Sequence, residues 1–211
     1  MNTSRWEKLG AVAGMVFGVL AALAFLTLGD APDFVDDPDT VGRFFADNEG
    51  RILATTGLAA LAALALAWFA SGLREAMGRD DRGVAVPGAG AVGIGAAIAA
   101  SSYAISGGIL AVGAQRVNEH GDEGAASAFL NYDLFQVIFG ASAPIGFAVI
   151  LAGVAVFTLG PGGFLPRWVG WVSLVLAVVG LIPPISWTLT FGMALWSILV
   201  GILMLRRPAA A

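Results

Sequence analysis

The sequence lacks most of the residues on which enzymes and cofactor-binding proteins depend. Its 211 residues include no cysteine, which excludes disulfides, thiolate metal sites and cysteine nucleophiles. The only histidine, His120, cannot supply a pair of haem or zinc ligands, and the only lysine, Lys8, precedes the first apolar segment. The HExxH, GxSxG and P-loop patterns are also missing. We therefore expect no cofactor, no metal site and no enzymatic activity.

Charge is also scarce. Only 12% of the residues are charged, against roughly a quarter in soluble domains, while 58% are hydrophobic and the mean hydropathy is +0.83. A water-soluble surface cannot be built from this composition. Because about 20 apolar residues cross a bilayer, we predict one all-α transmembrane domain over residues 1–211. Its six predicted spans cover residues 9–28, 52–73, 91–114, 137–159, 168–182 and 187–205.

The basic residues predict the orientation of these spans. They concentrate in the head, the loops after spans 2 and 4, and the tail, whereas the other loops hold most of the acids. Short cytoplasmic loops are the ones enriched in Lys and Arg. We therefore expect a multi-pass protein of the plasma membrane with both termini in the cytoplasm. The basic residues on the predicted inner side are Arg5, Lys8, Arg74, Arg79, Arg82, Arg167, Arg206 and Arg207.

The first outer loop has the pattern of a short amphipathic helix. Asp37 is a good N-cap and Pro38 suits the first helical position. Val41, Phe44 and Phe45 then form an apolar stripe that faces the bundle or the lipid, and Gly50 is the predicted end. The helix is interpreted as a packed connector, with a lid over an outer cavity as the alternative. The acids around it are interpreted as a solvated loop, since their spacing does not match an EF-hand.

Three glycines four residues apart mark one face of the first span, at Gly10, Gly14 and Gly18. Small residues let two helix backbones approach closely in a bilayer. The stripe predicts packing against another helix of the same chain, and homodimerisation through this face is the alternative.

Polar residues within the predicted spans are few, and five of them are candidates for a ligand pocket. They are Tyr103, Tyr132, Asp133, Gln136 and Ser142. An ionisable residue inside a membrane is a functional candidate by default, although the distance of Asp133 from the apolar centre favours solvation at the interface over a role in the pocket. Pro144 predicts a bend in the fourth span or a freed carbonyl one turn earlier, which would open space near Ser142. The sequence leaves open whether this helix is continuous or broken.

Two segments resemble a known family. They are the run from Asp39 to Ala54, which reads DTVGRFFADNEGRILA, and the later LPRWVGW at residues 165–171. They resemble uncharacterised actinobacterial multi-pass membrane proteins of the DUF4386-like group. The resemblance implies a small helical membrane protein, and it carries over no activity, substrate or catalytic residue.

Two functions remain after these exclusions. The first is a non-catalytic membrane protein that binds a lipid, an apolar small molecule or a membrane-protein partner, including a second copy of itself. The alternative is a small oligomeric transporter or exporter of an apolar substrate. An intramembrane enzyme using Tyr132, Asp133 and Gln136 ranks last. Nothing in the sequence suggests binding of nucleic acid.

Overall fold

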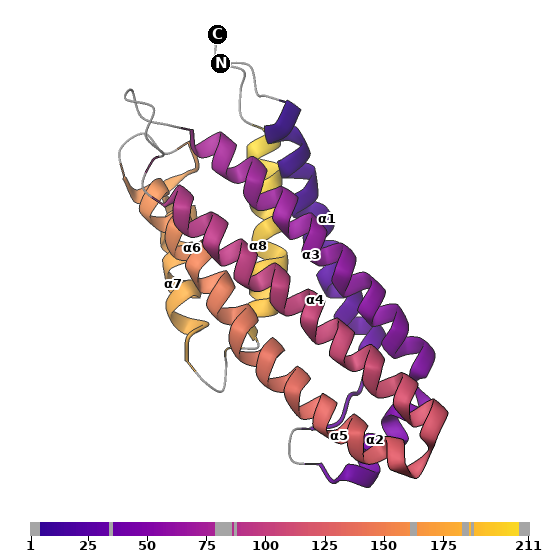
Figure 1. The fold of residues 1–211 in the computed structure, drawn as a ribbon. Helices are drawn as coiled ribbons and strands as arrows, with labels where there is room; N and C mark the ends of the chain where they lie inside the picture. Colours follow the sequence, from indigo (N-terminus) through magenta and orange to yellow (C-terminus); the bar gives the residue numbers. More distant parts are fainter. Residues whose placement is uncertain are drawn as a thin grey trace.

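The computed structural model describes residues 5–33, 36–78, 86, 88–160, 164–182, 186 and 188–206. Within these residues every regular element is a helix (Figure 1). One of them, η1, is a short π-helix that joins α5 to α6 without a break. The elements are α1 (Arg5–Leu28), α2 (Pro38–Asp47), α3 (Glu49–Met77), α4 (Ala89–His120), α5 (Asp122–Val137), η1 (Ile138–Ser142), α6 (Ala143–Leu159), α7 (Arg167–Val179) and α8 (Thr188–Leu205).

The predicted all-α bundle of apolar helices is confirmed. Five helical runs in the described part of the chain are long and apolar enough to cross a membrane, if α5, η1 and α6 count as one run. The predicted span 168–182 corresponds to α7, which has 13 residues. At 1.5 Å per residue it is roughly 20 Å long, shorter than a hydrocarbon core of roughly 30 Å. The sixth span therefore stays a prediction.

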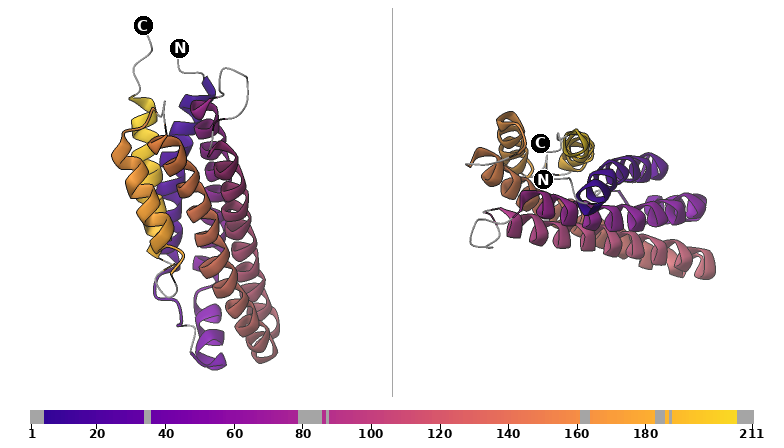
Figure 2. Two further views of the ribbon diagram at one scale, coloured as in Figure 1. Left: turned by 90° about the vertical axis from the view of Figure 1, so that its left-hand side faces the viewer. Right: turned by 90° about the horizontal axis from the view of Figure 1, so that it is seen from above.

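The helices form a ring of neighbours. Helix α1 packs on α3, α3 on α4, α4 on α6 and α6 on α7, while α8 returns to α1. α1 begins and α8 ends at the same end of the bundle, the inner end of the predicted topology (Figure 1). Helices α7 and α8 do not reach the opposite, outer end, where α2 lies (Figure 2). The outer end therefore has fewer helices around its centre.

The buried side chains fall into two clusters. The larger, the inner core, includes Phe17, Phe69, Tyr103 and Phe147, together with Trp196 of α8. The smaller, the outer cluster, lies under α2. It consists of Leu28, Val41, Phe45, Ile52, Leu110, Ala114, Val117, Ala128 and Tyr132.

The glycine stripe of α1 packs against helices of the same chain. A Cβ added to Gly10 would lie 2.5 Å from the Cα of Gly72 in α3, so the two backbones are in direct contact. Gly14 faces the ring of Phe69 in α3, and Gly18 faces the carbonyl of Ala194 in α8. This face of α1 is therefore occupied within one chain.

Helix α2 begins as its sequence predicts. The Asp37 carboxylate accepts a hydrogen bond of 2.9 Å from the Thr40 amide, and these bonds hold the pKa of the Asp37 carboxyl below its ordinary value of 3.8. Its apolar stripe faces the bundle, with Phe45 fully buried against Tyr132. The predicted end at Gly50 is wrong. Asn48 ends α2 and α3 begins at Glu49, because the side-chain amide of Asn48 donates to the Phe44 carbonyl and closes the last turn.

The helix around Pro144 is continuous. Proline has no amide hydrogen, so the carbonyl of Gly140, four residues earlier, loses its usual helical partner. The π-helix η1 lies at this point, and the hydroxyl of Ser186, just before α8, donates to the Gly140 carbonyl at 3.3 Å. The predicted freed carbonyl is thus present, and a neighbouring segment satisfies it.

Some sequence predictions concern residues outside the described ranges. These are the inner-side cations Arg79, Arg82 and Arg207 and the start of the last span at Trp187.

Candidate functional site

A cavity of about 430 Å³ lies between the inner core and the outer cluster. Three helical runs each line it with residues spaced i, i+3, i+4 and i+7, the pattern of one helix face. The three stripes are Ala21, Ala24, Phe25 and Leu28 on α1; Tyr103, Ser106, Gly107 and Leu110 on α4; and Tyr132, Phe135, Gln136 and Phe139 on α5 and η1.

The cavity exists because small residues face it from several sides. Ala21 and Ala24 on α1, Ala59 on α3 and Gly107 on α4 line it but do not fill the space between their helices. On the inner side, the ring of Tyr103 closes the floor. It makes edge contacts with Phe17, Phe139 and Phe147 at centroid distances of 6.0, 5.2 and 6.0 Å. The floor is therefore rigid and aromatic.

Three buried hydroxyl groups on the cavity wall have no hydrogen-bond partner among the described residues. They belong to Tyr103, Ser106 and Thr190, whose side chains are only 2%, 1% and 6% exposed. A buried polar group without a partner costs roughly 1–3 kcal/mol, and most such groups in folded proteins are paired. The described residues thus leave three buried hydroxyls beside the cavity without a hydrogen-bond partner.

The opposite wall is held by a hydrogen-bonded tyrosine. The Tyr132 hydroxyl donates to the carbonyl of Pro32 in the loop after α1, and the Gln136 side-chain amide donates to the Tyr132 oxygen at 3.0 Å. Edge contact with Phe45 fixes the ring. In contrast to Tyr103, this tyrosine fastens a loop to a helix.

That loop carries two carboxylates at the mouth of the cavity. Gly29 adopts a φ of +66° directly after α1, a left-handed conformation that glycine accepts readily at the end of a helix. Arg51 of α3 donates to the carbonyls of Thr27 and Leu28, both at 3.1 Å. Asp30 and Asp33 follow, and both are exposed while lining the cavity. The cavity is therefore open to solvent at the outer end.

The structure brings together three of the five predicted pocket residues, namely Tyr103, Tyr132 and Gln136. Asp133 is partly exposed and does not line the cavity, because one residue of an α-helix turns it about 100° from Tyr132. Ser142 is partly exposed and does not line the cavity.

Sequence reasoning missed four residues of this site. The sequence singles out neither Ser106 nor Thr190, and the acids around the predicted amphipathic helix, Asp30 and Asp33 among them, are interpreted as a solvated loop. The spacing of Tyr103, Ser106 and Leu110 would have placed Ser106 beside the tyrosine. Among the described residues, no group of three or more His, Asp or Glu side chains is placed to hold a metal ion.

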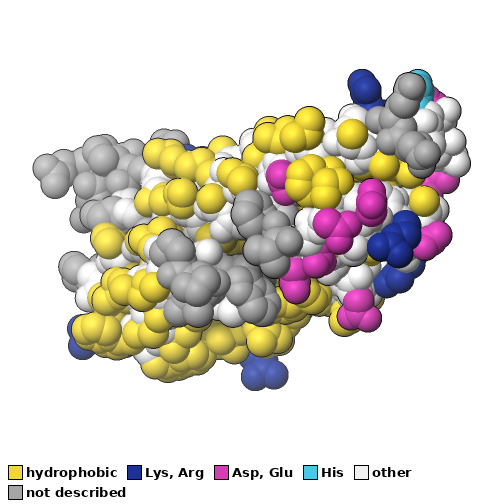
Figure 3. Space-filling view, turned by 90° about the horizontal axis from the view of Figure 1, so that it is seen from below, with side chains coloured by type: hydrophobic (Ala, Val, Ile, Leu, Met, Phe, Trp, Pro, Cys, Tyr) yellow, Lys and Arg dark blue, Asp and Glu magenta, His cyan; other side chains and the backbone are white. Residues whose placement is uncertain are grey.

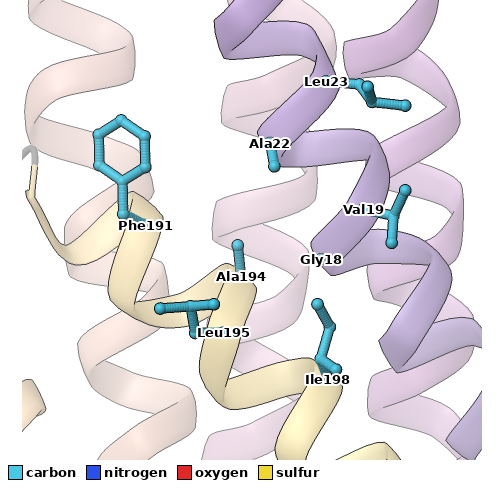
Figure 4. Close-up of a pocket in the computed structure, with 8 residues that line it drawn as sticks. All are labelled: Gly18, Val19, Ala22, Leu23, Phe191, Ala194, Leu195 and Ile198. Carbon is cyan, nitrogen blue, oxygen red and sulfur yellow. The ribbon is translucent and has the colours of Figure 1, made fainter.

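A second hollow, of about 330 Å³, is a shallow groove between α1 and α8 (Figure 4). Gly18 lies at its base, and Val19, Leu23 and Leu195 are exposed beside it. All eight residues that line it are apolar or glycine, so the groove offers no side-chain hydrogen bond to orient a ligand. The cavity between the two clusters is the better candidate.

Comparison of the chain with known protein families, curated proteins and solved structures finds no match. The resemblance to the DUF4386-like group therefore stays a prediction, and the cavity is the feature of the chain that bears on its function.

Proposed function

We propose that this chain is a non-catalytic integral membrane protein that binds one lipid, or another largely apolar small molecule with a polar end, in the cavity between its inner core and outer cluster. The observation that carries this proposal is the set of buried, unpartnered hydroxyls on Tyr103, Ser106 and Thr190. A ligand that forms hydrogen bonds with these hydroxyls offsets the free-energy cost of burying them unpaired.

The size and lining of the cavity support this proposal. Small-molecule sites occupy roughly 300–1,000 Å³ and combine apolar walls with a few placed polar groups. This cavity of about 430 Å³ is lined by rings and aliphatic groups, with hydroxyls at separate points. Its lining includes no histidine, cysteine or lysine that could activate a nucleophile, so we propose binding without chemistry.

The orientation and location of the protein belong to the same proposal. We propose that it resides in the plasma membrane with both termini in the cytoplasm, so that the mouth at Asp30 and Asp33 faces outwards. A reporter fused to the carboxyl terminus should then be active only inside the cell. An active reporter outside would reverse the orientation and make the cavity cytoplasmic.

Native mass spectrometry of the purified protein, with identification of retained molecules, tests the binding proposal. We expect one small molecule per chain in the wild type, and loss of at least tenfold in its occupancy in the double variant Ser106→Ala/Thr190→Val. The matched control is Ser102→Ala/Thr158→Val, which removes hydroxyls already bonded to the carbonyls of Ile98 and Val154. Equal occupancy in both variants, or an empty wild type, would contradict the proposal. The same spectra report whether the chain forms oligomers.

One observation favours transport as a second function. The cavity is bordered by η1, where the α5–α6 run changes its hydrogen-bond pattern next to Pro144, and interruptions of this kind often mark functional sites in helices. If the ligand crosses the membrane, liposomes containing the protein should release a trapped ligand faster than empty liposomes. Binding without faster release would leave the binding function alone.

A further inference from the structure

The charge at the cavity mouth restricts the ligand further. Asp30 and Asp33 are the only charged residues among those that line the cavity. Both lie on the loop that Tyr132 fastens through Pro32, so their backbone is held beside the opening. Any ligand that fills the cavity places one end near two carboxylates and near no cation of the lining.

Arg51 lies beside Gly29 of the cavity lining, but it forms no ion pair with these carboxylates. The Arg51 guanidinium donates to the carbonyls of Thr27 and Leu28 and to the side-chain oxygen of Asn48. In the part of the chain that the structure describes, no ion pair joins a basic side chain to Asp30 or Asp33. Acidic side chains are numerous over this end of the molecule (Figure 3). A cleft lined by one sign of charge raises the local concentration of the opposite ion.

The walls behind the mouth suit a cation with an apolar body. The rings of Phe25, Phe135 and Phe139 line the cavity together with Tyr103 and Tyr132. The face of an aromatic ring attracts organic cations by about 0.5–2 kcal/mol. Ser106 and Thr190, whose buried hydroxyls have no partner among the described residues, line the same cavity and are polar groups for the other end of the ligand.

We infer that the cavity selects amphipathic organic cations, with the positive centre at Asp30 and Asp33 and the apolar body among the aromatic rings. This inference rests on the proposed binding function and deepens it. A ligand with an anionic headgroup would place its charge beside the two carboxylates and is disfavoured.

Two probes of the same shape and opposite charge test the inference. Tetraphenylphosphonium and tetraphenylborate are measured by equilibrium dialysis against the full chain in nanodiscs of phosphatidylcholine, with empty nanodiscs subtracted. We expect the wild type to bind the phosphonium at least tenfold more tightly than the borate. Asp30→Asn/Asp33→Asn should abolish this preference. The control Asp39→Asn/Asp47→Asn removes the same charge from exposed positions of α2 outside the cavity lining. This variant should keep most of the preference for the phosphonium.

A second measurement needs no substitution. Phosphonium binding at a solvent-exposed acidic mouth should weaken severalfold when salt rises from about 0.05 M to about 0.5 M, because salt screens charges in water. Binding of an uncharged probe, tetraphenylsilane, should not weaken.

The outcomes separate this inference from the proposed function. If both ions bind equally and Ala59→Phe, which fills the cavity, removes both, the cavity binds apolar molecules and the selection for cations is refuted. The same holds if both double variants of aspartate lower phosphonium binding equally, because the effect is then one of net charge. If no probe binds and no molecule is retained in native mass spectrometry, the proposed function fails as well.

Discussion

The inner and outer halves of this bundle are packed in different ways. In the inner core, small residues bring backbones into direct contact, as between Gly10 and Gly72 or between Gly95 and Gly146. In the outer cluster, large side chains such as Phe45 and Tyr132 interlock under the short helix α2, and Arg51 and Tyr132 tie loops down by hydrogen bonds. The cavity lies where one kind of packing gives way to the other.

The difference shows how a small helical protein can combine stability with a binding site. Helices that touch through glycine and alanine leave no space between them. Helices α7 and α8 stop short of the outer end (Figure 2), so bulky side chains and a loop must close that end instead. Such closure is less complete, and it leaves a cavity with polar groups that have no partner within the described chain.

The largest effect on stability is expected from breaking the backbone contact between α4 and α6 in the inner core. A Cβ at Gly146 would lie 2.6 Å from the amide nitrogen of Ala99 and 2.7 Å from the Gly95 carbonyl oxygen. Gly146→Val should therefore lower the free energy of unfolding by about 3 kcal/mol. The control Gly108→Val introduces the same side chain where nothing lies within 4 Å. Thermal unfolding in neutral detergent compares the two, and equal midpoints would refute direct backbone contact.

A second prediction sharpens the contrast between the two tyrosines. Tyr132→Phe removes the hydrogen bonds to Pro32 and Gln136. It should lower the free energy of unfolding by about 2 kcal/mol. Hydrogen exchange should rise in residues 29–33 and α2, while the amides of the inner core remain protected. Tyr103→Phe removes a hydroxyl that has no partner among the described residues and should not destabilise the protein. A similar loss of stability in both variants would show that the two hydroxyls have the same role.

The unpartnered hydroxyls of Ser106 and Thr190 should lower the stability of the protein without ligand. Without ligand, Ser106→Ala/Thr190→Val removes two unpartnered buried polar atoms and should raise the free energy of unfolding by about 1 kcal/mol. The control Ser102→Ala/Thr158→Val breaks hydrogen bonds and should not raise it. Denaturation of delipidated protein gives the comparison. A loss of stability in the cavity variant would mean that these hydroxyls already have partners.

The smallest effect on stability is expected from removing the N-cap of α2. Hydrogen bonds from Thr40 lower the pKa of Asp37 from 3.8, so this bond stabilises α2 fully above that pH and less as the pH falls through the lowered pKa. Asp37→Ala should speed hydrogen exchange in α2 at neutral pH and remove this acid dependence. Asp47→Ala, at the other end of α2, should retain the dependence. No change in either variant would show that the cap contributes nothing measurable.

The sequence predicts best what depends on local chemistry. Asp37, Pro38 and the stripe of Val41 and Phe45 are sufficient to predict α2 and its buried face. The end at Gly50 was missed because the side-chain amide of Asn48, two residues earlier, donates to the Phe44 carbonyl and ends the helix before the glycine.

The cavity was only partly predictable. Tyr103, Tyr132 and Gln136 were found because polar residues are rare in apolar helices. Their distance from Asp30 or Thr190 depends on how α1, α4 and α8 are rotated about their axes, and no short sequence pattern encodes that rotation. For the same reason, the glycine stripe on α1 predicted a close neighbour without showing that α3 and α8 share it.

The contact between Ser186 and the Gly140 carbonyl makes two distant positions thermodynamically interdependent. With Pro144 present, Ser186→Ala leaves that carbonyl without either partner. If Pro144 were alanine, its restored amide could bond to the same carbonyl and make the serine dispensable. Natural variants that lose the proline should therefore also tolerate loss of the serine, whereas those that keep the proline should retain a hydrogen-bond donor at position 186.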